Sequence, residues 1–451
     1  MGIANAASVF ETRIFDENGV KTEIFTDTFG NKVAVRNDSS GANNNGNTSK
    51  LATAFQYDIV NNLTKIAPPK AFNIGDNNTP DWNNAFCTSM TYNTLGQLTS
   101  RQTPDAGTDS LLYDKKGNLR FVKNAKGAAN NYFIYYKYDG LNRQVEEGAM
   151  RLISPTNFKQ SNADLATYPS PGDTVKVKYL YDAIPAGYSI MSNNLKGRLY
   201  VIEYFSDRYP AVKGQIFYSY DANGNIEWIE QYIPKSSVND GNGYRVAKIE
   251  YQYDAVGKIA KIYFHRTSPP GSSPDAFYAW YDYDELGRLE RVFANRIDLR
   301  PAAPNAQYTY WPGGQARRLV LGNTLQGVDY LYNSRDWLTQ INHQNLYYTE
   351  DPGGDGGGTG VPNSDRFGQI IGYNQQKGIA LGHADFVSQY NGNISWAFSN
   401  TAGNLKPVAV NTGLTGSVFK YDKANRLTKA NWGHYSGLAN FQSLRPHRHR
   451  L

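Results

Sequence analysis

The chain has 451 residues, of which 40% are hydrophobic, and a net charge of +6 at pH 7. Its lysines and arginines are spread along the sequence, which argues against nucleic-acid binding, because such proteins carry a basic stripe or patch. The dense basic run from Arg445 to Arg450 is typical of a disordered or truncated tail, with a binding arm as the alternative. No stretch approaches the roughly 20 apolar residues that a membrane helix needs.

Cysteine content and the first residues set further limits. Cys87 is the only cysteine, so the chain can form no internal disulfide and no multi-thiolate metal site. The segment from Met1 to Ala7 lacks the charged start and apolar core of a secretory signal peptide. If the parent protein is exported, we expect its signal to lie elsewhere.

A seven-residue phrase recurs along the chain. It consists of an aromatic residue, Asp or Asn, two variable residues, Gly or Asn, one further residue, and Leu or Ile, as in Tyr283 to Leu289 (YDELGRL). Repetition of this kind is typical of proteins whose units contact mainly their neighbours. Close copies start at Tyr57, Tyr92, Tyr113, Tyr220, Tyr253 and Tyr421, and looser copies start at Phe15, Thr26, Tyr138 and Tyr332.

Each position of the phrase suits a tight turn. The Asp or Asn can accept a hydrogen bond from the backbone two residues later, and the Gly or Asn adopts a positive φ at low cost. We therefore predict a type I turn that is closed by a left-handed residue and a bulge. The residues predicted to build these structural turns are Tyr57, Asp58, Tyr92, Asn93, Gly96, Tyr113, Asp114, Gly117, Tyr138, Asp139, Tyr220, Asp221, Gly224, Tyr253, Asp254, Gly257, Tyr283, Asp284, Gly287, Tyr421 and Asp422.

The residues that flank the turns alternate between apolar and polar. Ile216, Tyr218 and Tyr220 precede one turn at a period of two, and Leu119 and Phe121 follow another. This period is typical of strands with one buried face. Tyr outnumbers Phe, 34 to 20, and a Tyr ring can pack while its hydroxyl stays in water. The sequence therefore predicts an all-β chain of hairpins whose tyrosine hydroxyls are wet.

Four polar or irregular segments interrupt the repeats. They cover residues 37–50, 68–86, 149–173 and 183–196, and the last of them separates Tyr181-Asp182 from Gly197-Arg198-Leu199. Insertions at turns cost little free energy, because loop-closure entropy grows only logarithmically with length. Residues 149–173 and 183–196 are therefore places for variable function, with simple expansion of a turn as the alternative interpretation.

The phrase resembles the YD repeat of the RHS family, which includes bacterial Rhs proteins, the BC components of insecticidal Tc toxins, and teneurins. Segments 103–108, 310–314 and 389–396 also resemble the bacterial branch. The resemblance implies a long antiparallel sheet that spirals into a hollow shell, often around a toxic C-terminal polypeptide. It divides the chain into a repeat array (1–300), RHS core-like repeats (301–435) and a basic tail (436–451).

The resemblance also implies a location and partners. We expect a secreted or cell-surface bacterial protein, without a signal in this fragment, whose partner is a C-terminal toxin or effector cargo or the remainder of the shell. The alternative is a cell-surface adhesion or carbohydrate-binding module, in which tyrosines of the sheet would bind glycans.

The loop Asp351-Pro352-Gly353-Gly354-Asp355-Gly356 resembles the end of the core in toxin-type RHS proteins, where two aspartates are implicated in self-cleavage. Here the second Asp follows the first by four residues and not by six, and a further repeat comes after the loop. We therefore interpret it as an insertion. The carboxylates of Asp351 and Asp355 could ligate Ca²⁺, but their spacing matches no established calcium loop.

No other pattern in the sequence points to catalysis. The six histidines are scattered, and only His447 and His449 stand close together. A Gly-x-Ser-x-Gly elbow, a P-loop and a dinucleotide fingerprint are all absent from the sequence. We therefore predict a structural scaffold without catalytic, cofactor-binding or metal-binding residues, rather than an enzyme.

Overall fold

The structure is a computed structural model that describes residues 9–15, 21–37, 51–72, 79–170, 174–205, 213–234, 244–265, 276–322, 325–344, 346, 351–354, 365–374, 386–401, 414–422, 425–435 and 441–443. Its secondary structure is almost entirely antiparallel β, as the sequence predicts. The chain forms two compact units, one of residues 1–52, 281–294 and 301–451, and one of residues 53–280 and 295–300. We refer to them as unit 1 and unit 2.

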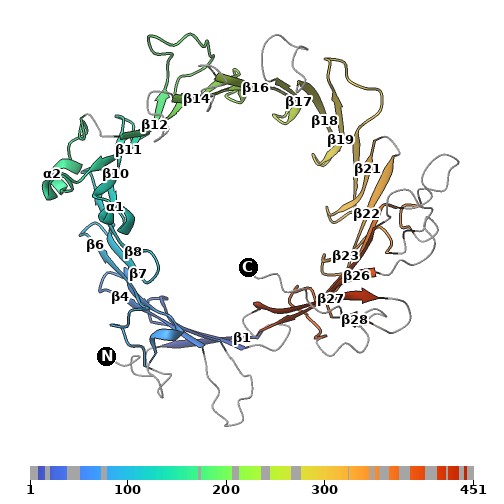
Figure 1. Cartoon of the computed structure of the whole chain (residues 1–451), viewed down its shortest axis with the longest axis horizontal. Helices are drawn as coiled ribbons and strands as arrows, with labels where there is room; N and C mark the ends of the chain where they lie inside the picture. The colour runs from blue at the N-terminus through green and yellow to red at the C-terminus, as the bar shows by residue number, and fades with distance from the viewer. Residues whose placement is uncertain are drawn as a thin grey trace. The chain divides into compact units, whose positions relative to one another are not determined.

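Unit 2 is a run of hairpins in which each strand pairs with the strand before it and the strand after it (Figure 1). Its strands are β4 (Leu51–Tyr57), β5 (Leu63–Ala67), β6 (Thr88–Tyr92), β7 (Leu98–Thr103), β8 (Gly107–Tyr113), β9 (Leu119–Lys123), β10 (Tyr132–Tyr138), β11 (Gln144–Arg151), β12 (Thr174–Tyr181), β13 (Leu199–Phe205), β14 (Lys213–Tyr220), β15 (Ile226–Pro234), β16 (Tyr244–Tyr253), β17 (Ile259–His265) and β18 (Phe277–Tyr283), with the ends of β4 and β18 reaching into unit 1.

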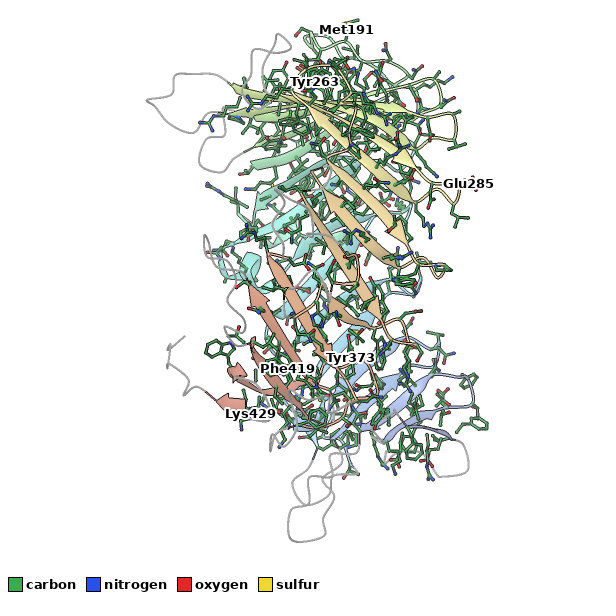
Figure 2. The ribbon with its side chains drawn as sticks, turned by 90° about the vertical axis from the view of Figure 1, so that its right-hand side faces the viewer. Met191, Tyr263, Glu285, Tyr373, Phe419 and Lys429 are labelled. Carbon is green, nitrogen blue, oxygen red and sulfur yellow. The ribbon has the colours of Figure 1, made fainter. Side chains whose placement is uncertain are left out.

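Unit 1 contains two such runs. The first is β1 (Phe10–Phe15), β2 (Lys21–Thr26) and β3 (Lys32–Asn37). Figure 2 shows the side chains on the strands, with Glu285 in the turn between β18 and β19. The second run is β19 (Leu289–Asn295), β20 (Ala306–Tyr310), β21 (Ala316–Leu321), β22 (Gln326–Tyr332), β23 (Leu338–Ile341), β24 (Phe367–Gly372), β25 (Trp396–Thr401), β26 (Leu414–Tyr421), β27 (Leu427–Tyr435) and β28 (Phe441–Ser443).

Each repeat phrase joins two strands. Its first residue ends one strand and its last residue begins the next, as Tyr57 ends β4 and Leu63 begins β5. The register shifts by one residue directly before the tyrosine: Gln56 pairs with Lys65 and Tyr57 with Leu63, so Thr64 is the extra residue. This β-bulge increases the local twist of the hairpin. The same shift precedes Tyr92, Tyr113, Tyr138, Tyr181, Tyr220, Tyr253, Tyr310, Tyr332 and Tyr421.

The segment predicted as a loop over 149–173 is largely folded. Strand β11 extends to Arg151, and two short helices follow, η2 (Pro155–Asn157) and α2 (Gln160–Ala163). Phe158 and Ala163 pack against Phe121 and Phe133 of the sheet, with ring centroids of Phe133 and Phe158 5.4 Å apart. The insertion therefore covers apolar sheet surface, which an extended loop would leave in water.

The other interruptions differ in how far they fold. Residues 183–196 place Leu195 in a core with Tyr200, Val201 and Phe217. Residues 68–86 contain η1 (Pro69–Ala71), which packs beside β4 and β5. Of the predicted loop 37–50, residues 38–50 lie outside the described residues, as do residues 73–78 and 171–173. In the predicted tail, residues 441–443 form β28, and 436–440 and 444–451 lie outside the described residues.

Candidate functional site

The repeat turns are held by their aspartates. In the first turn of unit 2, Asp58 Oδ1 accepts hydrogen bonds from the backbone N–H groups of Val60 and Asn62, both at 2.9 Å. Asn61 has a φ of 67°, which is the left-handed closure of the turn; in the next turn Gly96 takes this place with a φ of 74°. The same double acceptance occurs at Asp27, Asn93, Asp114, Asp139, Asp254, Asp284 and Asn333.

The side chain four positions after the turn aspartate donates a hydrogen bond to the second carboxylate oxygen of that aspartate. Asn62 Nδ2 donates to Asp58 Oδ2 at 3.0 Å, and Arg288 Nε donates to Asp284 Oδ2 at 2.7 Å. The side-chain hydrogen bond from Asn62 lowers the pKa of Asp58. Both oxygens are thus engaged within the turn, which suits a capping role. The same contact is made by Asn31, Asn118, Arg143, Asn225 and Arg426.

The repeat tyrosines connect neighbouring hairpins. Tyr92 Oη donates to the carbonyl of Leu63, at 2.8 Å, where Leu63 is the last residue of the preceding phrase. The expectation that these hydroxyls point into water was wrong, because they satisfy backbone acceptors of the previous hairpin. We call this series the tyrosine ladder; its other members are Tyr138 to Leu119, Tyr181 to Gln144, Tyr220 to Leu199, Tyr253 to Ile226, Tyr310 to Leu289, Tyr373 to Leu338 and Tyr421 to Ile394, at 2.6–3.1 Å.

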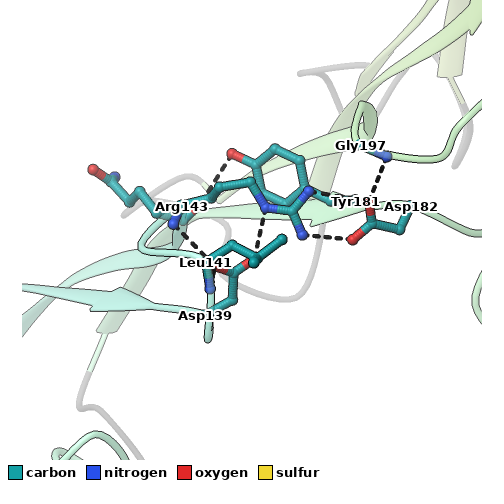
Figure 3. Close-up of polar contacts among 7 residues, drawn as sticks. Asp139, Leu141, Arg143, Tyr181, Asp182 and Gly197 are labelled. Carbon is teal, nitrogen blue, oxygen red and sulfur yellow. Dashed lines mark hydrogen bonds and ion pairs between the residues drawn. The ribbon is translucent and has the colours of Figure 1, made fainter.

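Arginines reinforce the ladder at some steps. The Arg143 guanidinium donates to Asp139 Oδ2 of its own turn at 2.7 Å and to both carboxylate oxygens of Asp182 in the next repeat, at 3.0 and 2.5 Å (Figure 3). It also lies over the Tyr181 ring, 4.4 Å from the centroid. The hydrogen bonds from Arg143 lower the pKa of Asp182. Arg288 covers the ring of Tyr310 in the same way, also at 4.4 Å.

The turn that contains residues 183–196 closes despite the insertion. The Asp182 backbone N–H donates to the carbonyl of Arg198 at 2.9 Å, and the Gly197 N–H donates to Asp182 Oδ1 at 2.7 Å. The first contact is equivalent to that between Asp58 and Asn62 in the uninterrupted turn. Asp182 itself adopts a φ of 71°. The inserted residues therefore leave the two flanking strands in the ordinary repeat geometry.

One recurrent residue was missed by sequence reasoning. Where the bulge residue is a threonine, its hydroxyl donates to the backbone carbonyl of the residue before the repeat tyrosine. The sequence signal was a Thr directly after the phrase, so the repeat unit has eight informative positions and not seven. The contacts are Thr64 to Gln56, Thr99 to Thr91, Thr339 to Leu331 and Thr428 to Lys420, at 3.0–3.1 Å.

At two other bulges, the residue at this position holds an insertion of unit 2 against the sheet. Arg120, only 2% exposed, donates to the carbonyls of Ala163, Leu165 and Tyr168 in the insertion, and to that of Tyr136 on the neighbouring strand, at 2.7–3.2 Å. Tyr200 Oη donates to the carbonyl of Ile190 at 2.8 Å. The same repeat position therefore closes its own hairpin in the threonine copies and holds an inserted segment at Arg120 and Tyr200.

The candidate reactive residues are placed as follows. Asp351 is buried, and its Oδ2 accepts from the Gly353 N–H at 3.1 Å, whereas Asp355 lies outside the described residues. Cys87 Sγ contacts the carbonyl of Asp81 at 3.3 Å, and burial raises the pKa of this thiol. Within the described ranges, no group of three or more His, Cys, Asp or Glu is arranged for a metal ion, and no helix is long and apolar enough to cross a membrane.

Comparison with known proteins gives matches at the level of structure. No protein-family model and no curated protein matches the chain. The Photorhabdus luminescens Tc holotoxin pore matches over 94% of the chain with 12% identity and a TM-score of 0.55. TcdB2-TccC3 matches over 94% with 14% identity and a TM-score of 0.56, and TcdB2-TccC3-Cdc42 over 94% with 13% identity and a TM-score of 0.54.

These matches define the class of fold. The chain has the RHS/YD-repeat fold of the shell type, as the sequence phrase predicts. The chain spans about a fifth of the length of the chains that it matches, with 19% to 21% of each covered.

Proposed function

We propose that this chain is a structural scaffold that forms part of the wall of an RHS shell, and that the shell encloses and helps to deliver a C-terminal toxin or effector. The tyrosine ladder is the observation that carries the proposal. Each step joins one hairpin to the preceding one through a half-buried side chain, in addition to the strand pairing. A sheet with this second set of connections suits a wall, and its fold is that of Tc toxin structures.

The partners and location follow from the same proposal. The partner is the C-terminal cargo or the remainder of the shell, and the protein acts outside the cell or at its surface. Residues 1–300 and 301–435 serve as the repeat array and the core-like repeats of the wall. The proposal gives the turn aspartates a structural role, which is supported by the backbone and side-chain donors that their oxygens accept.

Photo-crosslinking from the two faces of one strand tests enclosure. Glu250 and Tyr251 are neighbours on β16, so their side chains project from opposite faces. Two variants of the full-length gene product are made, each with a photo-crosslinking amino acid at one of these positions. Enclosure predicts cross-links to the C-terminal polypeptide from one of the two positions, and none from a control position in a turn, Glu285.

Two outcomes would contradict enclosure. Cross-links from neither face would leave the shell without a cargo. Binding of the protein to an immobilised glycan array, combined with that result, would favour the adhesion module over the toxin shell. Cross-links from both faces and from Glu285 alike would indicate a nonspecific association.

A further inference from the structure

A half-open cavity lies on unit 2 beside β10, β11 and β12, with a volume of about 520 Å³. Its floor includes Ile134 and Ala149, which pair across β10 and β11. Phe133, the chain neighbour of Ile134, packs on Phe158 and Ala163 of the insertion 152–170. Because side chains alternate along a strand, the cavity opens on the opposite face of the sheet.

Three basic side chains from three different elements line this cavity. Lys126 comes from α1 (Ala125–Ala129), Arg151 from the end of β11, and Lys176 from β12. Among the lining residues that the structure describes, Glu147 is the acidic one. Cations outnumber carboxylates within this described lining, and a negatively charged ligand would gain from their combined field.

The fold fixes the backbone that carries these cations. Glu147 pairs with Val177 and Gly148 with Val175, so Lys176 is the extra residue of a bulge, a feature that redirects a side chain. The Asn124 side chain caps α1 by accepting from the Gly127 N–H at 2.7 Å. A Cβ at Gly127 would lie 2.6 Å from the Tyr132 carbonyl, so α1 sits close against β10. Lys126 is thus held beside the sheet.

The rest of the lining is partly apolar and partly hydrogen-bonding. Tyr132 stands opposite Arg151 across the two strands, next to the floor of Ile134 and Ala149. Asn130 and Thr174 add neutral polar groups at the rim. A pocket with this lining suits a ligand that combines one anionic group with a small apolar body, because few polar groups and an apolar floor set orientation and specificity.

We propose that this cavity, the cationic pocket, binds a small organic anion whose carboxylate or phosphate is held by Lys126, Arg151 and Lys176 and whose apolar part rests on Ile134 and Ala149. Hydrogen bonds between such charged groups are stronger than neutral ones. The proposal stands apart from shell formation, since all the residues that carry it lie in one short segment of unit 2.

Isothermal titration with two anions and one cation tests the pocket. The probes are phenyl phosphate, inorganic phosphate and benzylammonium, each added to the intact chain. We expect phenyl phosphate to bind about tenfold more tightly than inorganic phosphate, because burial of a phenyl ring contributes an extra free energy of this order. Benzylammonium should not bind. In the double variant Lys126→Ala/Lys176→Ala, phenyl phosphate should bind at least about tenfold more weakly.

A matched variant separates the pocket from general positive charge. Lys115→Ala/Lys116→Ala removes the same charge from the turn after β8, outside the cationic pocket, and should leave phenyl phosphate binding unchanged. Equal weakening in both double variants, equal affinity for the two anions, or no binding of phenyl phosphate to the unmodified chain would each overturn the proposal. Circular dichroism checks that both variants are folded.

Discussion

At the scale of single residues, the stability of this protein depends on small polar side chains that form hydrogen bonds with backbone groups at the turns and bulges. A turn aspartate or asparagine accepts two backbone N–H groups that strand pairing cannot satisfy. The bulge threonine performs the converse function by donating to a carbonyl beside the bulge. Both contacts are local, so each residue can be tested by itself.

Replacement of Asn93 by Ala should lower the unfolding free energy by about 1 kcal/mol, because Leu95 N–H and Gln97 N–H lose their acceptor. The urea midpoint, measured by circular dichroism, checks this. Thr94→Ala in the same turn is the control and should change stability by less than about 0.5 kcal/mol. A similar loss in both variants would show that the Asn93 contacts contribute nothing particular.

The bulge threonine gives a second test. Thr99→Val keeps the shape of the side chain but removes the hydrogen bond to the Thr91 carbonyl, so we expect a loss of about 1 kcal/mol. Thr99→Ser keeps the hydroxyl and should lose less. If the valine variant is as stable as the serine variant in urea, the hydroxyl contact has no role in the bulge.

The contacts of the turns lie close together in the sequence, whereas many of the contacts around them do not. Asp58, Gly96 and their equivalents act within five residues, so their spacing carries the information. The acceptors of Arg120 in the insertion lie 43 to 48 residues further along the chain. No local sequence pattern predicts such a distant partner, and the bulge position that Arg120 occupies holds Thr in other copies of the repeat. The tyrosine hydroxyls were misassigned for the same reason, since their acceptors belong to the preceding hairpin.

At the scale of elements, the insertion 152–170 depends on one buried cation. Arg120 is the donor for three of its carbonyls, while Phe158 and Ala163 supply its apolar contact with the sheet. The insertion and the sheet beneath it therefore form a small local core, in which polar and apolar contacts support each other.

Arg120→Met should expose the insertion, because its carbonyls lose their donors while the side-chain volume is nearly kept; we expect a loss of at least about 3 kcal/mol. Hydrogen exchange should rise in residues 152–170 before it rises in β14 to β17. Arg101→Ala, which removes a surface ion pair with Asp109, should cost less than about 1 kcal/mol. Unchanged exchange in the Arg120 variant would contradict the anchoring role.

At the scale of the whole molecule, the tyrosine ladder makes each hairpin's stability depend on the preceding one. Among the described residues, strand pairing and the ladder connect hairpins that are neighbours in the chain. In such proteins, stability is close to a sum of repeat terms and interface terms. Damage at one step should therefore spread to adjacent hairpins and fade with distance.

High pH should weaken every ladder step together. Burial raises the pKa of Tyr92, Tyr138, Tyr220 and Tyr253 above the ordinary value of about 10. The unfolded chain then releases these protons first, so stability is complete below about pH 10 and falls as the pH rises through the folded-state values. The urea midpoint and tyrosinate absorbance, followed from pH 8 to 12, check this. A midpoint that stays constant while tyrosinate forms would contradict it.

The split turn at Asp182 has a practical consequence. Because Asp182, Gly197 and Arg198 restore the ordinary closure around residues 183–196, the two strands pair in the same way whether the connection between them is short or long. Such a hairpin is therefore a site where evolution or a protein engineer can insert new sequence while the surrounding sheet keeps its geometry.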